Sequence, residues 1–529
     1  MKKKNLWAVA MAAIMVAASL TPTVVYADDE AGEGTMAESV ALANGDPISF
    51  TPLKQTGSNG KNVLYEVFET LVDQDGVGGD VYGCMAKDWY MDGNDLYVEI
   101  YDYIYDSEGN HITADDVVFS YDYSWDNGYT TSLYKTYTDG VEKVDDYKVV
   151  FHWKEEKLDA YFGIESVLLG QFIFSQAAFE ESPDEMATDP VGTGPYILNE
   201  FVPGSHAVLE ARENYWQTDE SLVGPQHRQN VKNITYKFIS DSAQISNALK
   251  VGAVDFADAV DEASIGNFQN SDDWTIVSGY DNKLLCAFFN CLEGTPLADS
   301  NLRAALCYAI NSDDILAALG GEEYARKVYE YSVPDVLYYN ADCENWDSYY
   351  NVADLDLAQE YLSKSDYAGD TLQLYYNAAE FGAYAEACSL CIGAACEQLG
   401  IPYEIHPVNQ IEDIISTTNG DWNIVVMTIG GDGAAVDYMR NNFNSTRYEG
   451  LLGNYYDDDL EALYAKTYSA SGATEENVSE FNKYLIDHYY VYGLAQCISN
   501  SVMKSGIITD CAVRTRRNYT LPGSWEYVQ

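Results

Sequence analysis

The chain has 529 residues, of which 84 are acidic and 29 are basic, so its formal net charge is −55. A surface with this charge repels nucleic acid and anionic lipid headgroups, and nucleic-acid binding is therefore excluded. The length is sufficient for two or three domains with hydrophobic cores.

Residues 1–27 are predicted to be an export signal. Three lysines at positions 2–4 precede an apolar run at 6–20, and small residues at positions 25 and 27 fit a cut before Asp28. The apolar run is short for a membrane span, so a short N-terminal anchor is the weaker alternative. No cysteine lies near the cut, so we expect no lipid attachment. The protein is expected to be exported, either periplasmic or extracellular and associated with the cell surface.

In the first part of the chain we expect a helix, a strand and a second helix. The helix is predicted at 61–72, and the strand at 95–106. Thr113 is predicted to cap the second helix, at 116–125, because threonine is a favoured N-cap and acidic residues follow in the first turn. The buried face of the first helix is predicted to contain Val63, Leu64, Val67, Phe68 and Leu71.

Residues 192–216 contain two strand-like alternations that are joined by a Pro-Gly turn at 203–204. The segment opens on Gly-Thr-Gly-Pro-Tyr, where Gly192 and Gly194 permit a positive φ. It closes on Arg-Glu-Asn-Tyr-Trp, ending at Trp216. A strand at 231–240 and then a helix with a short strand at 241–257 follow.

A strand at 283–290 and a helix after Asp299 come next. On this helix Arg303 is expected to make a surface ion pair. The buried stripe of the helix is predicted to consist of Leu302, Ala305, Leu306, Ala309 and Ile310.

The segment 371–429 is predicted to contain a parallel pair of strands with a right-handed helical crossover. Strand-like patterns at 371–377, 402–408 and 423–429 surround a helical pattern at 381–399. Ligands of such sheets lie beyond the carboxyl ends of the strands. The sequence at that point is Gly-Gly-Asp at 430–432, where two glycines let the backbone approach a ligand and a carboxylate follows.

The ten cysteines are interpreted mainly as buried small hydrophobic residues, although disulfides that the spacing does not pair remain an alternative. On the helix 381–399, Cys388 and Cys391 are expected on the packing face and Cys396 away from it. No histidine accompanies them at ligand spacing, so no metal cluster is predicted. A calcium loop beginning at Asp73 is also rejected, because its twelfth position is Cys84 rather than glutamate.

The sequence favours binding over catalysis. It contains no HExxH, GxSxG, Walker or dinucleotide-binding motif, and its six histidines are scattered. We therefore expect a protein that is not an enzyme and that has no cofactor and no metal. The abundance of carboxylates keeps a secreted acidic hydrolase as the alternative from another class.

The segments 192–216 and 285–316, with the Thr-capped helix after 113 and the Gly-containing unit at 248–257, resemble family 5 of the bacterial extracellular solute-binding proteins, the peptide-binding subunits of ABC importers. The resemblance covers about residues 46–510. It implies an α/β fold of the two-lobed periplasmic-binding-protein type (type II, with an extra small domain) that closes on its ligand about a hinge.

The resemblance also implies a division of the chain. Residues 28–75, 186–285 and 495–529 would form lobe I, residues 76–185 a small satellite domain, and residues 286–494 lobe II. The strands that connect the lobes would cross near Asn290 and Gln496.

The implied function is to capture di- or oligopeptides as a monomer and to deliver them to an ABC permease. Asp432 matches the position at which family members hold the ligand's N-terminus with a carboxylate. The proline of the usual D-x-x-D-P pattern is missing, so Asp437 is the alternative anchor. The remaining predicted ligand-binding residues are Gly430, Gly431, Asn290 and Trp422. An oligosaccharide, a metal complex or another small solute is the alternative ligand.

Overall fold

The computed structural model of the chain describes residues 36–528 apart from 48, 54–56, 76–79, 128–132, 162, 259, 261, 281, 351–352, 379–381, 409–410, 416–420, 432, 441–442, 444–456 and 511–519. From Met36 onward the chain forms one compact unit. The predicted export signal lies outside the described residues. Helices in the described part are too short or too polar to span a lipid bilayer.

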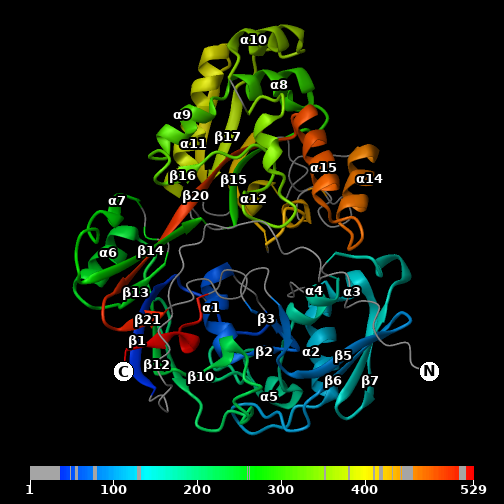
Figure 1. Cartoon of the computed structure of the whole chain (residues 1–529), viewed down its shortest axis with the longest axis vertical. Helices are drawn as coiled ribbons and strands as arrows, with labels where there is room; N and C mark the ends of the chain where they lie inside the picture. The colour runs from blue at the N-terminus through cyan, green and yellow to red at the C-terminus, as the bar shows by residue number, and fades with distance from the viewer. Residues whose placement is uncertain are drawn as a thin grey trace. The chain divides into compact units, whose positions relative to one another are not determined.

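The largest sheet contains twelve strands and is mixed (Figure 1). Ten of these strands are hydrogen-bonded in the order β10 (Tyr196–Val202), β11 (His206–Ala211), β12 (Val231–Phe238), β1 (Ala37–Asn44), β13 (Phe256–Ala257), β20 (Val491–Lys504), β15 (Lys283–Phe289), β19 (Ile424–Gly430), β17 (Leu372–Asn377) and β18 (Tyr403–Val408). Two further strands, β14 (Trp274–Tyr280) and β16 (Ala325–Arg326), pair with β20.

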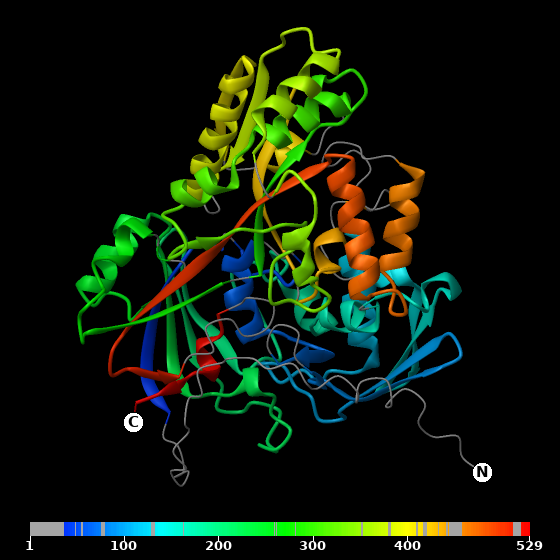
Figure 2. The same cartoon turned by 45° about the horizontal axis from the view of Figure 1, so that its top comes forward.

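Strand β20 connects the two halves of this sheet, as its course in Figures 1 and 2 shows. Its first residues pair with β15, where Leu285 is opposite Ala495, and its last residues pair with β14, where Trp274 is opposite Lys504. The change of partner falls at Gln496 and the next residue, which pair with the short strand β16. The ladder of backbone hydrogen bonds is therefore shared by both halves.

The chain crosses between the halves a second time between Tyr280, where β14 ends, and Lys283, where β15 begins. We expected this crossing near Asn290, but that residue follows the opposite end of β15. The hydrophobic pattern of β15 did not reveal which of its ends meets the other half of the sheet.

The predicted strand–helix–strand unit is present. Strand β17 is parallel to both β18 and β19, and α11 (Gly382–Leu399) lies between β17 and β18 in the chain. The thiols of α11 are not in disulfides. Cys388 and Cys396 are both fully buried, whereas Cys391 is only partly buried, so the expected orientation of Cys396 was wrong. The hydrophobic core covers more of the surface of α11 than the apolar stripe of this helix indicated.

Strand β15 is buried on both faces, which explains its continuous apolar sequence. Its side chains alternate between two cores: Leu285 and Phe289 pack with α11, and Leu284 and Phe288 pack on the opposite face. The first core also contains α8 (Ser300–Ala309) and α9 (Ser312–Ala318), and the second contains α14 (Asp458–Thr467) and α15 (Glu475–Asp487).

The predicted helix at 61–72 is only partly correct. Helix α1 (Gly57–Val67) ends earlier, and Glu69–Thr70 and Val72–Gln74 are the short strands β2 and β3. Strand β2 pairs with β9 (Phe172–Ile173), and β3 pairs with β4 (Val81–Gly83). Strand pairing, with the distant β9 and with β4 in a local hairpin, overrides the helical periodicity here.

The glycines at 192 and 194 have a role different from the predicted one. Neither adopts a positive φ. Instead, a Cβ on Gly192 would lie 2.0 Å from the carbonyl oxygen of Val67, and one on Gly194 would lie 2.5 Å from that of Glu66. Gly194 N–H also donates to the Val67 oxygen at 2.8 Å. The absence of side chains lets this turn pack directly against the end of α1.

Arg212, the residue after β11, contacts the same turn. Its guanidinium is buried and donates to the carbonyl oxygens of Thr193 at 2.8 Å and Asp106 at 2.8 Å. A single side chain thus joins the β10–β11 hairpin to the segment that precedes α2.

A four-stranded antiparallel sheet and helix α2 (Ala114–Asp126) form a separate hydrophobic core. The strands are ordered β5 (Ala86–Asp92), β6 (Asp95–Ile100), β8 (Lys148–Trp153) and β7 (Thr138–Asp145). Thr113 caps α2 as predicted, and its backbone N–H donates to Asp116 at 2.8 Å. The predicted strand at 95–106 ends earlier, at Ile100.

The remaining helices are α3 (Tyr134–Tyr137), α4 (Gly163–Leu169), α5 (Gln176–Glu181), α6 (Ser242–Lys250), α7 (Glu262–Ile265), α10 (Leu355–Lys364), α12 (Glu412–Ile415) and α13 (Asp437–Arg440), and the remaining strands are β21 (Ile508–Asp510) and β22 (Glu526–Tyr527). Arg303 on α8 was predicted to make an ion pair at the surface. It is buried instead and donates to the carbonyl oxygens of Leu297 and His488.

A buried carboxyl joins α1 to the C-terminal segment. Glu66 lies near the end of α1, and its Oε1 accepts a hydrogen bond from the backbone N–H of Gly523 at 2.9 Å. Burial raises the pKa of Glu66 to about 8, an effect that this hydrogen bond partly offsets. The side chain is therefore protonated in the folded protein at neutral pH.

Glu66→Gln should raise the melting temperature at pH 8 and leave it nearly unchanged at pH 4.5. The folded carboxyl has a pKa of about 8 against an ordinary value of 4.5, so the unfolded chain loses its proton first. Glu66 therefore makes the free energy of unfolding fall as pH rises between these values, and glutamine removes that dependence. Thermal unfolding of both proteins across this range checks the prediction. The surface variant Glu38→Gln is the control. An equal shift of the melting temperature of Glu66→Gln at both pH values would contradict the prediction.

Candidate ligand-binding site

The carboxyl ends of β17 and β19 lie at the edge of the sheet where the two halves meet. Gly430, the last residue of β19, pairs with Lys283, the first residue of β15, and so lies beside the crossing that precedes β15. On the other side of β15, Leu285 pairs with Ala495, which precedes the crossing at Gln496. The strand ends that were predicted to face a ligand therefore coincide with both crossings. We call this edge the rim.

The two rim glycines differ in their surroundings. Gly430 is exposed, and a Cβ there would meet nothing within 4 Å. Gly431 is buried, and a Cβ would lie 2.6 Å from the ring of Tyr438. That ring is fixed, because Tyr438 is fully buried and its hydroxyl donates to the carbonyl oxygen of Asn282 at 2.9 Å. Gly431 N–H donates to the same oxygen at 3.0 Å.

The two predicted anchors follow the rim glycines. Asp432 lies outside the described residues. Asp437 begins α13 and is buried, with 1% of its surface exposed, and its Oδ2 accepts a hydrogen bond from Ala434 N–H at 2.9 Å. The backbone of Gly433 accepts from Leu337 N–H at 2.9 Å, which fixes the path of this loop. Ligand contact by either aspartate stays a prediction.

Asn290 and Trp422 are not brought to the rim. They lie at the opposite end of β15 and β19, where Phe289 pairs with Ile424. Asn290 Nδ2 donates to the carbonyl oxygen of Trp422 at 2.8 Å, and both residues are buried. Their side chains thus join the ends of two strands. A direct contact with ligand stays a prediction for both.

An arginine that the sequence analysis did not single out joins the elements at the crossings. Arg326 Nε donates to Gln496 Oε1 at 2.6 Å, and its guanidinium lies 4.1 Å from the ring centre of Tyr280. It also forms an ion pair with Asp335 at 2.7 Å. Arg326 therefore contacts a residue at each crossing. Its strand, β16, has only two residues, so no periodic pattern could have revealed it.

A second contact joins the part of the chain that contains the four-stranded sheet to the α14–α15 pair. The carbonyl oxygen of Asp159 accepts from Ala470 N–H at 2.7 Å, and one of its carboxylate oxygens accepts from Ser471 N–H at 3.0 Å. The Ser471 hydroxyl donates to the other carboxylate oxygen. We call this contact, between residues 159–161 and 468–471, the seam. It lies between the cyan and orange elements of Figures 1 and 2.

Aromatic side chains extend the seam toward Asp437. Tyr161 is buried, and its ring centre lies 5.8 Å from that of Tyr468 and 6.3 Å from that of Tyr338. Burial, and then the charge of Asp437, raise the pKa of Tyr338. Because Asp437 follows the rim glycines in the chain, the seam and the rim belong to one continuous region.

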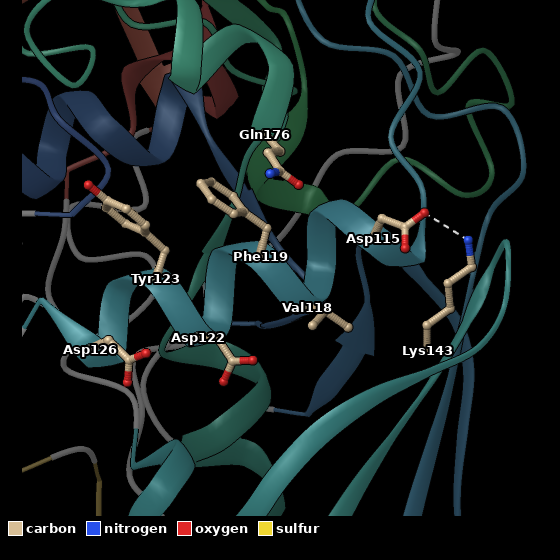
Figure 3. A pocket seen from close by; sticks show the side chains of 8 residues that line it. All are labelled: Asp115, Val118, Phe119, Asp122, Tyr123, Asp126, Lys143 and Gln176. Atoms are coloured by element: carbon tan, nitrogen blue, oxygen red, sulfur yellow. Dashed lines mark hydrogen bonds and ion pairs between the residues drawn. The ribbon is translucent and has the colours of Figure 1, made fainter.

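A hollow of 510 Å³ elsewhere on the protein does not contain any of these residues (Figure 3). It lies over an exposed face of α2 and is lined by residues that include Phe119, Tyr123 and Gln176. Lys143 and Asp115 at its margin are paired with each other at 2.7 Å. The hollow is open and its charged groups are solvated, so it carries no functional argument.

These features define a two-lobed α/β fold with paired strands between the lobes. Residues 80–450 match the model of the middle region of the bacterial extracellular solute-binding proteins, family 5. The match covers more than half of the chain, and the chain belongs to this family.

Among curated relatives, the oligopeptide-binding protein AppA of Bacillus subtilis is 25% identical over 287 residues, which are 52% of this chain and 50% of AppA. The chain thus spans about half the length of the curated relatives it matches.

Two solved structures confirm the predicted fold class. The structure of B. subtilis AppA in complex with a nonapeptide has a TM-score of 0.77 at 18% identity and covers 94% of this chain and 100% of AppA. The structure of NikZ from Campylobacter jejuni in complex with Ni(L-His) has a TM-score of 0.74 at 17% identity and covers 92% and 99%. At these identities the likeness concerns the fold.

Gly431→Ala should destabilise the protein, and Gly430→Ala should not. The added methyl at 431 would overlap the fixed ring of Tyr438, which should cost about 1–3 kcal/mol of the free energy of unfolding. The methyl at 430 enters open space, so this neighbouring substitution is the matched control. Urea unfolding of both variants checks the prediction, and equal stabilities would contradict the packing described for Gly431.

Proposed function

We propose that the chain is an exported solute-binding protein that captures peptides and delivers them to an ABC permease. Its membership of family 5 supports the class, and the coincidence of the rim with both crossings supports the place of the site. In open α/β sheets, ligands bind beyond the carboxyl ends of strands. The conclusion rests chiefly on that coincidence, because a ligand at the rim would contact the connection about which two lobes move.

The proposal includes the predicted division of the chain. Residues 28–75, 186–285 and 495–529 act as lobe I, residues 286–494 as lobe II, and residues 76–185 as the satellite domain. Two contacts support grouping the ends of the chain together: Gly523 N–H donates to Glu66, and Thr520 N–H donates to Asn62 at 3.0 Å. The mature protein acts as a monomer, periplasmic or at the cell surface, after removal of residues 1–27.

We propose that the protein captures its ligand through an ammonium–carboxylate contact and through closure of the lobes, and that no covalent bond is made or broken. The ligand's ammonium group binds a carboxylate that follows β19, with Asp432 as the first candidate and Asp437 as the second. A charge-assisted hydrogen bond of this kind is worth about 1.5–3 kcal/mol when partly removed from water. The seam then holds the satellite domain against lobe II and stabilises the closed state.

Asp432→Ala should weaken the binding of a peptide with a free N-terminus by about tenfold or more, because one charge-assisted contact is lost. The same peptide with an acetylated N-terminus should bind poorly to the parent protein. Calorimetry with the tightest binder from a peptide library checks both. Asp437→Asn is the comparison that separates the two anchors. Equal affinity of the parent for both forms of the peptide would contradict the ammonium anchor.

Asp159→Ala should lower peptide affinity by about threefold to tenfold through the loss of seam hydrogen bonds, each worth about 0.5–1.5 kcal/mol. The substitution removes no side chain of the rim, so it should act by favouring the open state. Calorimetry measures the affinity, and small-angle scattering with ligand measures the closure. Glu156→Ala, an exposed acidic residue in the preceding turn, is the matched control. Unchanged affinity and closure in Asp159→Ala would exclude a role for the seam.

A metal complex is the second candidate ligand, because the chain shares its fold with NikZ, whose structure holds Ni(L-His). Native mass spectrometry of ligand that co-purifies with the protein distinguishes the two. Incubation with labelled peptides and glycans tests the remaining alternative, a hydrolase, which would release products with turnover.

A further inference from the structure

Three side chains that are distant in the sequence converge in the interior beneath the 192–216 hairpin. They are Glu69 on β2, Cys84 just after β4, and His227 at the end of the short helix η2 (Pro225–His227). All three are buried, and one ligand atom from each lies within 4.8 Å of the others. The pairs that include sulfur are 3.5 Å (Cys84 Sγ to Glu69 Oε1) and 3.8 Å (Cys84 Sγ to His227 Nε2).

A fourth acidic or metal-binding side chain, Asp73, adjoins this group. Oδ2 of Asp73, on β3, lies 3.4 Å from the same nitrogen, Nε2 of His227. Asp73 is also buried, with 1% of its surface exposed. The imidazole nitrogen of His227 therefore lies close to both the sulfur of Cys84 and an acidic oxygen of Asp73.

Two of the three printed separations lie in the range expected between ligands of one tetrahedral metal ion, and the third is slightly longer. Zinc binds sulfur at about 2.3 Å and nitrogen or oxygen at about 2.0–2.2 Å, so tetrahedral neighbours lie roughly 3.4–3.6 Å apart. The measured values are 3.5, 3.8 and 3.4 Å.

Glu69 is oriented by two donors. The hydroxyl of Tyr215 donates to Oε1 at 2.5 Å, and Nε1 of Trp216 donates to Oε2 at 2.7 Å. Carboxylates that bind metals are typically held by such outer hydrogen bonds, and each oxygen retains a lone pair for the ion.

The loop that carries His227 is also fixed in place. Gln226 Nε2 donates to the carbonyl oxygen of Gln74 at 2.6 Å. Gly224 packs beneath Tyr82 so closely that a Cβ would lie 2.3 Å from its ring. These contacts hold η2 against the β3–β4 hairpin, which supplies Asp73 and precedes Cys84.

We propose that Glu69, Cys84 and His227, with the carboxylate of Asp73 beside His227, form a structural site for a divalent metal ion of the zinc class. A thiolate with an imidazole and carboxylates suits zinc rather than magnesium or calcium. The ion would join β2 and the β3–β4 hairpin to helix η2, which follows residues 192–216 in the chain. This site is independent of peptide capture, since none of its residues lies at the rim or the seam.

The proposal departs from the metal-free protein that the sequence predicts. The ligands are spread over residues 69–227, so no motif spacing brings them together. Cys84 appeared only as the residue that disqualifies a calcium loop.

The full mature chain, freed of any affinity tag and stripped of metal, should bind one equivalent of Zn²⁺ in calorimetry and gain thermal stability. With Co²⁺ it should show a thiolate-to-metal charge-transfer band. Cys84→Ser and His227→Gln should each weaken zinc binding by at least tenfold and remove the thermal shift. Cys396→Ser and His206→Gln, a buried cysteine and a partly exposed histidine outside the cluster, are the matched controls and should behave as the parent does.

Peptide affinity should stay unchanged in Cys84→Ser, which separates failure of this proposal from failure of the peptide assignment. The proposal is overturned if the parent binds no Zn²⁺, or if both cluster variants bind it as tightly as the controls do. If the variants do not fold, the Co²⁺ spectrum of the parent protein tests whether a thiolate binds the metal. A cobalt complex without the thiolate band would exclude Cys84 as a ligand.

Discussion

The continuity of β20 is the constraint on which the remaining architecture depends. This strand of 14 residues exchanges backbone hydrogen bonds with β15 at one end and with β13 and β14 at the other. Backbone groups in a buried sheet must be paired, so neither half can detach from β20 without exposing unpaired donors and acceptors. Any rotation of one half against the other would therefore fall on the residues near Gln496 and on the connection between Tyr280 and Lys283.

The contacts of Arg326 act on this restricted hinge. The residue contacts Tyr280, which ends the strand before one crossing, and Gln496, which lies at the other. Its ion pair with Asp335 and its position over an aromatic ring hold the two connections in a fixed relation. The seam lies away from the crossings in the sequence and adds a few hydrogen bonds between the part that contains the four-stranded sheet and the α14–α15 pair.

Much of the fold could be predicted from local patterns. The strand–helix–strand unit of β17, α11 and β18, the capped helix after Thr113 and the hairpin at 192–216 all have periodicities and turn residues that agree with their tertiary environment. The sequence-based predictions are wrong where strand pairing or burial, rather than a local pattern, determines the structure. Residues 69–74 became short strands because β9 and β4 pair with them, and Cys396 became buried because the core covers more of α11.

The candidate site was predictable only in part, for the same reason. Ligands of a parallel sheet bind beyond the carboxyl ends of its strands, so the position of Gly430 and Gly431 at such an end could be predicted from the sequence alone. Asn290 and Trp422 could not, because a strand's sequence does not reveal which of its ends meets the hinge. Arg326, Asp159 and the cluster around Glu69 depend on contacts between segments that no local period connects.

The order in which the strands occur in the chain has a consequence for biosynthesis. Strand β13 lies between β1 and β20 in the sheet, yet β20 begins more than 230 residues after β13 ends. The edge of β13 that faces β20 therefore stays open while the ribosome makes almost the whole polypeptide. Assembly in which distant segments must meet is slow and exposes unpaired strand edges. A nascent chain of this topology depends on being kept from premature association until its last segments are available.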